Sequence, residues 1–261
     1  MSDDHNLSPP PAWPEIIQKI RTRTPARIFV PPGAAYSTGM QLELRSAHAR
    51  AVDAVWTEFD LHNEFPPDFV EEWKLFQVSS QAESKSQFLL RPDLGRKLSD
   101  AAKSLVSQNC RKSPDLQIVI GDGLSGAALS AQVPTLFPLL HQQANTRGWS
   151  LGQSFCVRNC RVGIMNEIGD LLAPRVLVLL IGERPGLATS ESLSSYMAYE
   201  PRSGQTDADR NLISNIHIRG VRVEDAAQRI ANLALQMMAL KLSGTTVKEE
   251  SLQIPHEASG A

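Results

Sequence analysis

The spacing of apolar residues changes along the chain. Between Ser37 and the prolines at 66–67, apolar residues recur every three or four positions, which predicts one long helix. The same spacing predicts a further helix over about 95–106. Residues 19–110 are therefore predicted to form a mainly helical N-terminal region. The two helical faces consist of Leu44, Ala47, Ala51, Val52, Val55 and Phe59, with His48 on or beside them, and of Leu98, Ala102, Leu105 and Val106.

Residues 1–18 do not show the apolar spacing of a helix. Four prolines within the first 14 residues disfavour a helix, and nothing in this segment could form a core. We therefore predict a flexible tail over 1–18.

After residue 110, short apolar runs alternate with helical patterns. The runs at 116–120 and 175–182 contain almost no polar residue, as expected for strands that are buried on both faces. Strand–helix alternation of this kind predicts an α/β fold with a Rossmann-like parallel sheet over residues 111–249. Residues 161–164, 194–201 and 211–218 are also predicted as strands. Pro134 and Pro138 are predicted to start or kink helix segments within 127–148.

The most buried predicted strand ends in two opposite charges, in the run "VLVLLIGERPGL" at 176–187. Sheets of this class bind ligands beyond the carboxyl ends of their strands. Glu183 is therefore expected at a binding crevice, with Pro185 and Gly186 fixing the turn that follows. The alternative interpretation is a simple ion pair between Glu183 and Arg184 or a nearby lysine.

A glycine motif follows the first predicted strand of the sheet. Gly121-Asp122-Gly123-Leu124-Ser125-Gly126 matches the dinucleotide pattern G-x-G-x-x-G. The next strand ends in Arg158, which would suit the 2′-phosphate of NADP, but a carboxylate at Asp122 would repel a pyrophosphate. The other interpretation is a tight turn between a strand and a helix.

A second motif is similar to one found in cobalamin domains. Asn215-Ile216-His217-Ile218-Arg219-Gly220 resembles D-x-H-x-x-G, in which the histidine binds cobalt. Asn215 stands where an aspartate would orient that histidine, and the motif lies near the end of its domain instead of opening it. A packed histidine is therefore the favoured interpretation of His217.

Composition excludes several classes of function. With 26 basic and 28 acidic residues, the chain lacks the basic excess of a general nucleic-acid binder. No apolar run reaches the length of a membrane helix, and the N-terminus does not resemble a signal peptide. The odd number of cysteines (Cys110, Cys156, Cys160) favours free thiols in a reducing cytoplasm. Because no nucleophile, metal or phosphate-loop motif is present, we expect a subunit that holds a ligand for a partner.

Several longer stretches resemble one family. "RVGIMNEIGDLLAPRVLVLLIGERPGL", "SLSSYMAYEPR", "DADRNLISNI" and "LSGTTVKE" closely resemble the small subunit of ethanolamine ammonia-lyase, and the resemblance covers about residues 20–249. It implies a partner, the large subunit, which carries the substrate site and the catalytic residues. It also implies adenosylcobalamin at the junction of the two subunits, with ethanolamine converted to acetaldehyde and ammonia by a radical mechanism.

The resemblance also implies cofactor-binding positions in this chain, and no catalytic or metal-binding ones. They are Val162, in the predicted strand over 161–164, Glu183, and Leu212. Relatives carry a cysteine at the position of Leu212, so this contact survives only if it runs through the backbone.

Two alternatives remain open from the sequence. One is an NADP-dependent oxidoreductase that uses the Gly121–Gly126 loop. The other is a non-enzymatic assembly protein whose N-terminal tail recruits it into a bacterial microcompartment.

Overall fold

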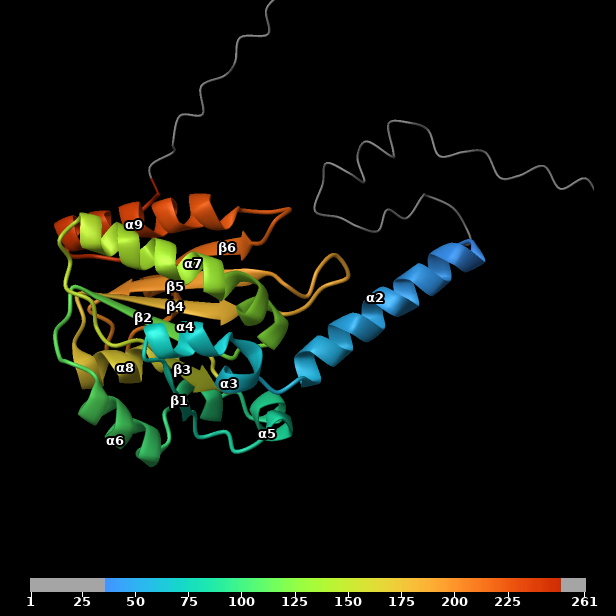
Figure 1. The fold of residues 1–261 in the computed structure, drawn as a ribbon, viewed down its shortest axis with the longest axis horizontal. Coiled ribbons are helices and arrows are strands. Elements are labelled where there is room, and N and C mark those ends of the chain that lie inside the picture. Colours follow the sequence, from blue (N-terminus) through green and yellow to red (C-terminus); the bar gives the residue numbers. More distant parts are fainter. Residues whose placement is uncertain (1–35, 250–261) are drawn as a thin grey trace, which may run out of the picture.

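A six-stranded sheet forms the centre of the protein (Figure 1). The computed structural model describes residues 36–249, so the predicted tail over 1–18 lies outside the described residues. The strands are β1 (Phe76–Ser79), β2 (Leu116–Gly121), β3 (Phe155–Arg158), β4 (Val176–Gly182), β5 (Leu193–Tyr199) and β6 (Asn211–Ile216). Their order across the sheet is β1-β3-β2-β4-β5-β6.

The sheet is mixed, so the α/β class is confirmed, and the expectation of a parallel sheet is wrong for two of its five strand pairings. Strands β1, β3, β2 and β4 are parallel, whereas β5 runs antiparallel to both β4 and β6. Only residues 183–192 connect β4 to β5, and no helix lies among them. A parallel connection needs a crossover of about a dozen residues or more, whereas a shorter link suffices for an antiparallel pair.

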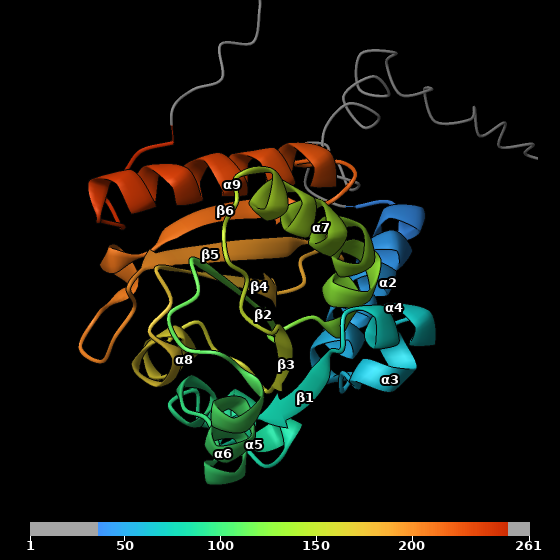
Figure 2. The same cartoon turned by 60° about the vertical axis from the view of Figure 1, so that its left-hand side comes forward.

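Helices cover the two faces of the sheet as separate layers (Figures 1 and 2). One layer contains α7 (Gly126–Thr146) and α9 (Val223–Leu240), and the other contains α6 (Asp100–Asn109) and α8 (Ile164–Leu172). Alternate residues of β4 enter the two cores, with Val178 in the first and Leu179 in the second. All seven residues of β4 are buried, which explains why its sequence shows no polar alternation.

Three further expectations differ from the structure. Residues 161–163 form a turn that leads into α8 instead of a strand. Pro134 and Pro138 do not begin helix segments of their own, because both lie inside α7, whose buried face packs on the sheet; a kink at these prolines stays a prediction. The strand β1 was not predicted, and it joins the edge of the sheet from within the N-terminal region that was expected to be mainly helical.

The long predicted helix is present as α2 (Thr38–Trp56), but it does not pack as expected. Ser37 caps it, accepting a hydrogen bond from the N–H of Met40. Of its residues only Met40 and Ala47 are buried, His48 is exposed, and Phe59 lies beyond the helix in the main core. Figure 1 shows α2 extending away from the sheet and its helical layers.

Short helices complete the described part of the chain: α3 (Leu61–Glu64), α4 (Pro67–Glu72), α5 (Lys85–Leu90), and the 3-10 turns η1 (Leu94–Arg96) and η2 (Asp207–Asp209). None of the helices within residues 36–249 has the length and apolar character needed to cross a membrane.

Candidate functional site

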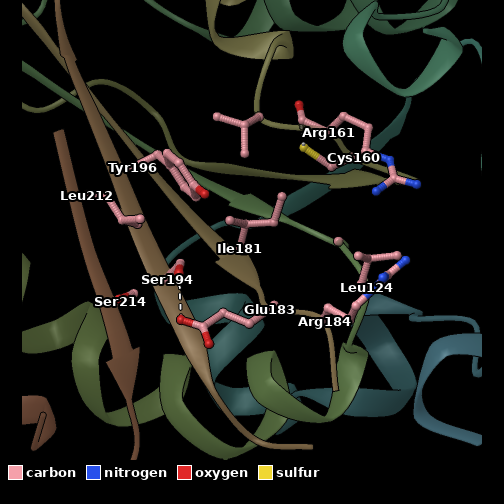
Figure 3. Close-up of a pocket in the computed structure, with 13 residues that line it drawn as sticks. Leu124, Cys160, Arg161, Ile181, Glu183, Arg184, Ser194, Tyr196, Leu212 and Ser214 are labelled. Atoms are coloured by element: carbon pink, nitrogen blue, oxygen red, sulfur yellow. Dashed lines mark hydrogen bonds between the residues drawn. The ribbon is translucent and has the colours of Figure 1, made fainter. Parts of the chain in front are cut away.

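A hollow opens where the connections of the sheet diverge (Figure 3). After β2 the chain turns to β3 on one side, and after β4 it turns to β5 on the other. Such a switch point leaves a crevice beyond the carboxyl ends of the two strands. The hollow has a volume of about 380 Å³ and is lined by Gly123, Leu124, Cys160, Arg161, Val162, Ile181, Gly182, Glu183, Arg184, Ser194, Tyr196, Leu212 and Ser214.

The three predicted binding residues all line this hollow. Val162 lies in the turn between β3 and α8, Glu183 follows β4, and Leu212 lies on β6. The side chain of Leu212 is 46% exposed. The structure therefore brings together three residues that are separated by up to fifty positions in the chain. Whether they bind a cofactor stays a prediction.

Glu183 is hydrogen-bonded to residues that lie on or next to β5 and β6. It forms no ion pair with a residue of the described chain. Its two carboxylate oxygens accept hydrogen bonds from the hydroxyls of Ser192 and Ser194, each at 2.7 Å. Oε1 also accepts the backbone N–H of Asn215 at 2.7 Å. Bonds to a charged acceptor are among the stronger hydrogen bonds in proteins. The alternative of a simple pair with Arg184 is therefore wrong.

Strands β5 and β6 supply the second wall. Ser194 and Tyr196 are two residues apart on β5, and Leu212 and Ser214 are two apart on β6, so each pair shares one face of the sheet. Tyr196 is paired in register with Leu212. Burial, and then the carboxylates of Asp207 and Glu183, raise the pKa of Tyr196. Its phenol therefore stays protonated at neutral pH and can donate a hydrogen bond.

Arginines form the opposite side. Figure 3 shows the guanidinium groups of Arg161 and Arg184 away from Tyr196 and Leu212. Burial lowers the pKa of Arg161, and the neighbouring charges of Arg184 and Arg96 lower it further. The hollow thus combines hydroxyl groups, one carboxylate, apolar side chains and positive charge.

The glycine motif serves the packing of this site. A Cβ on Gly123 would lie 2.6 Å from the carbonyl oxygen of Gly182, and a Cβ on Gly182 would lie 2.0 Å from that of Ser125. These glycines let the loop after β2 approach the end of β4. By contrast, a Cβ on Gly186 would meet open space among the described residues.

The dinucleotide alternative loses its supporting observations. Asp122 is 2% exposed and pairs with the buried Lys85 at 3.4 Å, inside the loop that would have to cradle a pyrophosphate. Arg158, the candidate for a 2′-phosphate, pairs with Glu58 at 2.9 Å.

His217 is a packed histidine, as favoured. It is 4% exposed, and its Nε2 lies 2.7 Å from Oδ1 of Asn215. Its Nδ1 accepts the backbone N–H of Arg219 at 3.2 Å. Both ring nitrogens are thus engaged, and within residues 36–249 no group of three potential metal ligands occurs.

All three cysteines are buried and free, as predicted. Burial raises the pKa of Cys160, which lines the hollow, and it has the same effect on Cys156. The thiol at Cys160 is therefore protonated and poorly nucleophilic.

Sequence reasoning missed Arg161, Ser194, Tyr196 and Ser214. The serines and the tyrosine lie at alternate positions in segments that were predicted as strands, which is the one signal that could have found them. Arg161 was assigned to a strand together with Val162, and its place in a turn at the sheet edge was not foreseen.

Comparison with known proteins gives a consistent result. A model of the family "Ethanolamine ammonia-lyase light chain (EutC)" matches residues 14–248. The chain is 37% identical over 235 residues to the ethanolamine ammonia-lyase small subunit of Clostridium acetobutylicum, covering 90% of this chain and 95% of that protein. It is also 37% identical to the small subunit of Listeria monocytogenes over 243 residues, covering 93% and 81% of the two chains. For the small subunit of Fusobacterium nucleatum the identity is 37% over 231 residues, covering 88% and 76%.

Proposed function

The chain belongs to the ethanolamine ammonia-lyase light-chain family, and from this premise we propose that it is the small subunit of an adenosylcobalamin-dependent ethanolamine ammonia-lyase. The assembled enzyme converts ethanolamine to acetaldehyde and ammonia. This chain holds the corrinoid at its interface with the large subunit, which carries the catalytic residues. The observation that supports this role is the meeting of Val162, Glu183 and Leu212 on the wall of one hollow at the switch point of the sheet.

The residues present fit the chemistry of a corrinoid. Its rim carries amide groups that donate and accept hydrogen bonds, and its tail carries ribose hydroxyls and one phosphate. The hollow offers the hydroxyls of Ser194 and Ser214, the phenol of Tyr196 and the carboxylate of Glu183 for the polar groups. Leu212 presents apolar surface to the macrocycle.

Glu183 has a structural part in this site besides any contact with the cofactor. It accepts hydrogen bonds from two residues near the start of β5 and from one near the end of β6. A carboxylate oxygen can accept more than one bond, so Glu183 joins the strand ends and keeps acceptor capacity for an amide of the corrinoid. Preorganised polar walls of this kind lower the ordering cost of binding.

The chain contributes binding and shielding, not bond-making. When bound, adenosylcobalamin supplies the radical through homolysis of its cobalt–carbon bond. The thiol at Cys160 is buried, and the carboxylate of Glu183 is held by three donors, so neither is placed as a nucleophile or base.

The large subunit is required because the hollow is open on the side along β6. Ser214 and Leu212 remain exposed on β6. The large subunit would close the hollow from this side. A cofactor held between two chains is shielded from water only in the assembled complex.

The proposed location is the cytoplasm, either free or packaged in a bacterial microcompartment. Deletion of residues 1–18 tests packaging. If the tail recruits the enzyme to a shell, the deletion releases it into the cytoplasm and leaves its specific activity unchanged; a variant that stays packaged would refute recruitment by this tail.

Co-expression with a candidate large subunit tests the proposed function. The purified complex should deaminate ethanolamine when adenosylcobalamin is added, and it should retain corrin absorbance after gel filtration. A complex that forms but neither retains the corrinoid nor turns over ethanolamine would overturn the proposal.

A further inference from the structure

Three arginines surround the turn that contains Val162, and none of them has a carboxylate partner within residues 36–249. Arg161 precedes Val162 directly, Arg184 follows Glu183, and Arg96 ends η1. The side chain of Arg96 packs on Gly163: a Cβ added at Gly163 would meet Cγ, Cδ and Cβ of Arg96 first. Arg184 and Arg96 both act on the charge of Arg161, so three positive charges lie near one another beside this turn.

Arg161 is held in place without being neutralised. Its guanidinium carbon lies 4.2 Å from the ring centroid of Phe88, and Nη2 donates to the carbonyl oxygen of Phe88 at 3.3 Å. Burial lowers the pKa of Arg161, and the positive charges of Arg184 and Arg96 act against its charge and lower that pKa further. This arrangement is expected where an anion completes the site.

The turn lies between two hollows. Arg161 and Val162 line the first, which also contains Glu183, and they line a second hollow of about 700 Å³ that also contains Gly163. The four carboxylates of the second hollow each have a partner: Asp93 pairs with Arg91, Glu167 with Lys103 and Asp207 with Arg210, while Asp170 accepts from Ser203. They leave the arginines around Val162 available to a ligand.

The helix α8 begins at the same turn. Its N-cap, Gly163, provides no side chain to cap the first amides. No acceptor within residues 36–249 takes the N–H groups of Val162 and Gly163. Helix amino ends carry partial positive charge and unpaired N–H groups, and they bind phosphate readily.

We propose that Arg161, with Arg96, Arg184 and the amino end of α8, forms an anion subsite that binds the phosphodiester in the nucleotide tail of the corrinoid. The proposal rests on the proposed function and extends it from the macrocycle to the tail. A guanidinium matches two phosphate oxygens with parallel hydrogen bonds. The subsite places the macrocycle in the hollow with Glu183 and directs the tail along Val162 toward the second hollow.

The test compares three corrinoids that differ in the tail. Adenosylcobalamin has the phosphodiester, adenosylcobinamide phosphate has a phosphate without the nucleotide base, and adenosylcobinamide has neither. Each is titrated into the complex with the large subunit by equilibrium dialysis and read by corrin absorbance. Arg161→Gln should weaken binding of the two phosphate-bearing corrinoids about tenfold or more, and it should leave adenosylcobinamide within about twofold.

Two further variants keep the test independent of folding, because Arg161 also packs on Phe88. Arg184 and Arg96 are exposed, and the double variant Arg184→Gln, Arg96→Gln should show the same selectivity for phosphate. Arg222 is exposed at the start of α9 in the opposite layer, and Arg222→Gln provides the matched control that should bind all three corrinoids normally.

Each outcome separates the subsite from the proposed function. A wild-type complex that binds none of the corrinoids would refute the proposed function itself. A wild-type complex that binds them, with variants that lose all three equally or lose none, would overturn the subsite alone. Loss of subunit association in the variants would also overturn it, because the arginines would then pair with the partner.

Discussion

The carboxylate of Glu183 accepts a hydrogen bond from the backbone N–H of Asn215, with 2.7 Å between Oε1 and the nitrogen. Asn215 has a φ of 62°, in the left-handed region, which asparagine tolerates better than most residues. Its side-chain oxygen lies 2.7 Å from Nε2 of His217. The Asn-x-His pattern therefore anchors the end of β6 to the end of β4, and it does so without presenting the histidine to a metal.

Replacement of Glu183 should affect both stability and cofactor binding. Glu183→Gln retains one acceptor oxygen and replaces the other with an NH₂ donor, so at least one of the three donors that the carboxylate now holds loses its acceptor. We expect it to lower the free energy of unfolding by about 2 kcal/mol and to weaken adenosylcobalamin binding in the complex at least about tenfold. Dialysis at a temperature where the variant stays folded measures the second effect.

Glu191→Gln is the control for this prediction, because Glu191 is an exposed acid in the same loop. It should change neither quantity. Normal cofactor affinity in Glu183→Gln would remove Glu183 from the binding site.

Leu212→Cys should report on cofactor contact by chemical protection. The three native thiols are at most 6% exposed, and burial raises the pKa of Cys110 to about 11. A thiol reagent should therefore react selectively with the introduced thiol. Adenosylcobalamin should slow this alkylation about tenfold or more in the complex. The same substitution at Leu235, which is exposed on α9, should react equally with and without cofactor; equal rates at both positions would place the corrinoid elsewhere.

Gly182→Ala should destabilise the protein through steric conflict. The added Cβ would lie 2.0 Å from the carbonyl oxygen of Ser125, so the loop after β2 must shift. Overpacking of this kind reduces the free energy of unfolding by about 1–3 kcal/mol. Gly39→Ala is the control, since nothing lies within 4 Å of a Cβ there and the residue is helical. It should stabilise the protein by about 0.5–1 kcal/mol, and denaturant unfolding measures both.

His141 should make the fold sensitive to mild acid. Burial between Trp73 and Phe137 lowers its pKa from 6.5 to about 4. Between these pH values His141 binds a proton in the unfolded chain but stays neutral in the folded state. The free energy of unfolding therefore falls as the pH decreases from 6.5 toward 4. His141→Phe should remove this loss, a gain of about 1 kcal/mol at pH 5 relative to pH 7 after allowance for the partly exposed ring.

Tryptophan fluorescence can follow this unfolding, because Trp73 lies 4.4 Å from the His141 ring. His48→Phe controls for adding a phenyl ring at an exposed position. An identical pH dependence in wild type and His141→Phe would contradict the assignment.

The isolated chain should not deaminate ethanolamine, with or without adenosylcobalamin. Its hollow offers no free carboxylate, reactive thiol or metal cluster within residues 36–249. Activity should appear only when the large subunit is added. Turnover by the chain alone, in a preparation shown by mass spectrometry to lack other proteins, would refute the role as a binding subunit.

The position of Glu183 was predictable from physical reasoning on the sequence, whereas Val162 and Leu212 came from the family resemblance. A wholly apolar run identifies a central strand, and the residue that ends it reaches the edge of the sheet. Val162 has no such signal, because a valine in a turn looks like any core valine.

The rest of the site depends on strand register and direction, which the local pattern does not encode. Tyr196 faces Leu212 only because β5 runs antiparallel to β6 with that pairing. The short link from β4 to β5 was a usable signal for an antiparallel pairing. The apolar pattern alone does not give strand direction. The unpaired state of Arg161 depends on where every nearby carboxylate finds its partner, which only the folded chain determines.

The most direct test of the account is a structure of this chain in complex with its large subunit and adenosylcobalamin. The account predicts that the corrin lies against the hollow lined by Val162, Glu183 and Leu212, with the large subunit closing the side along β6. Density for the corrin enclosed by the large subunit alone, or on another face of this chain, would contradict it.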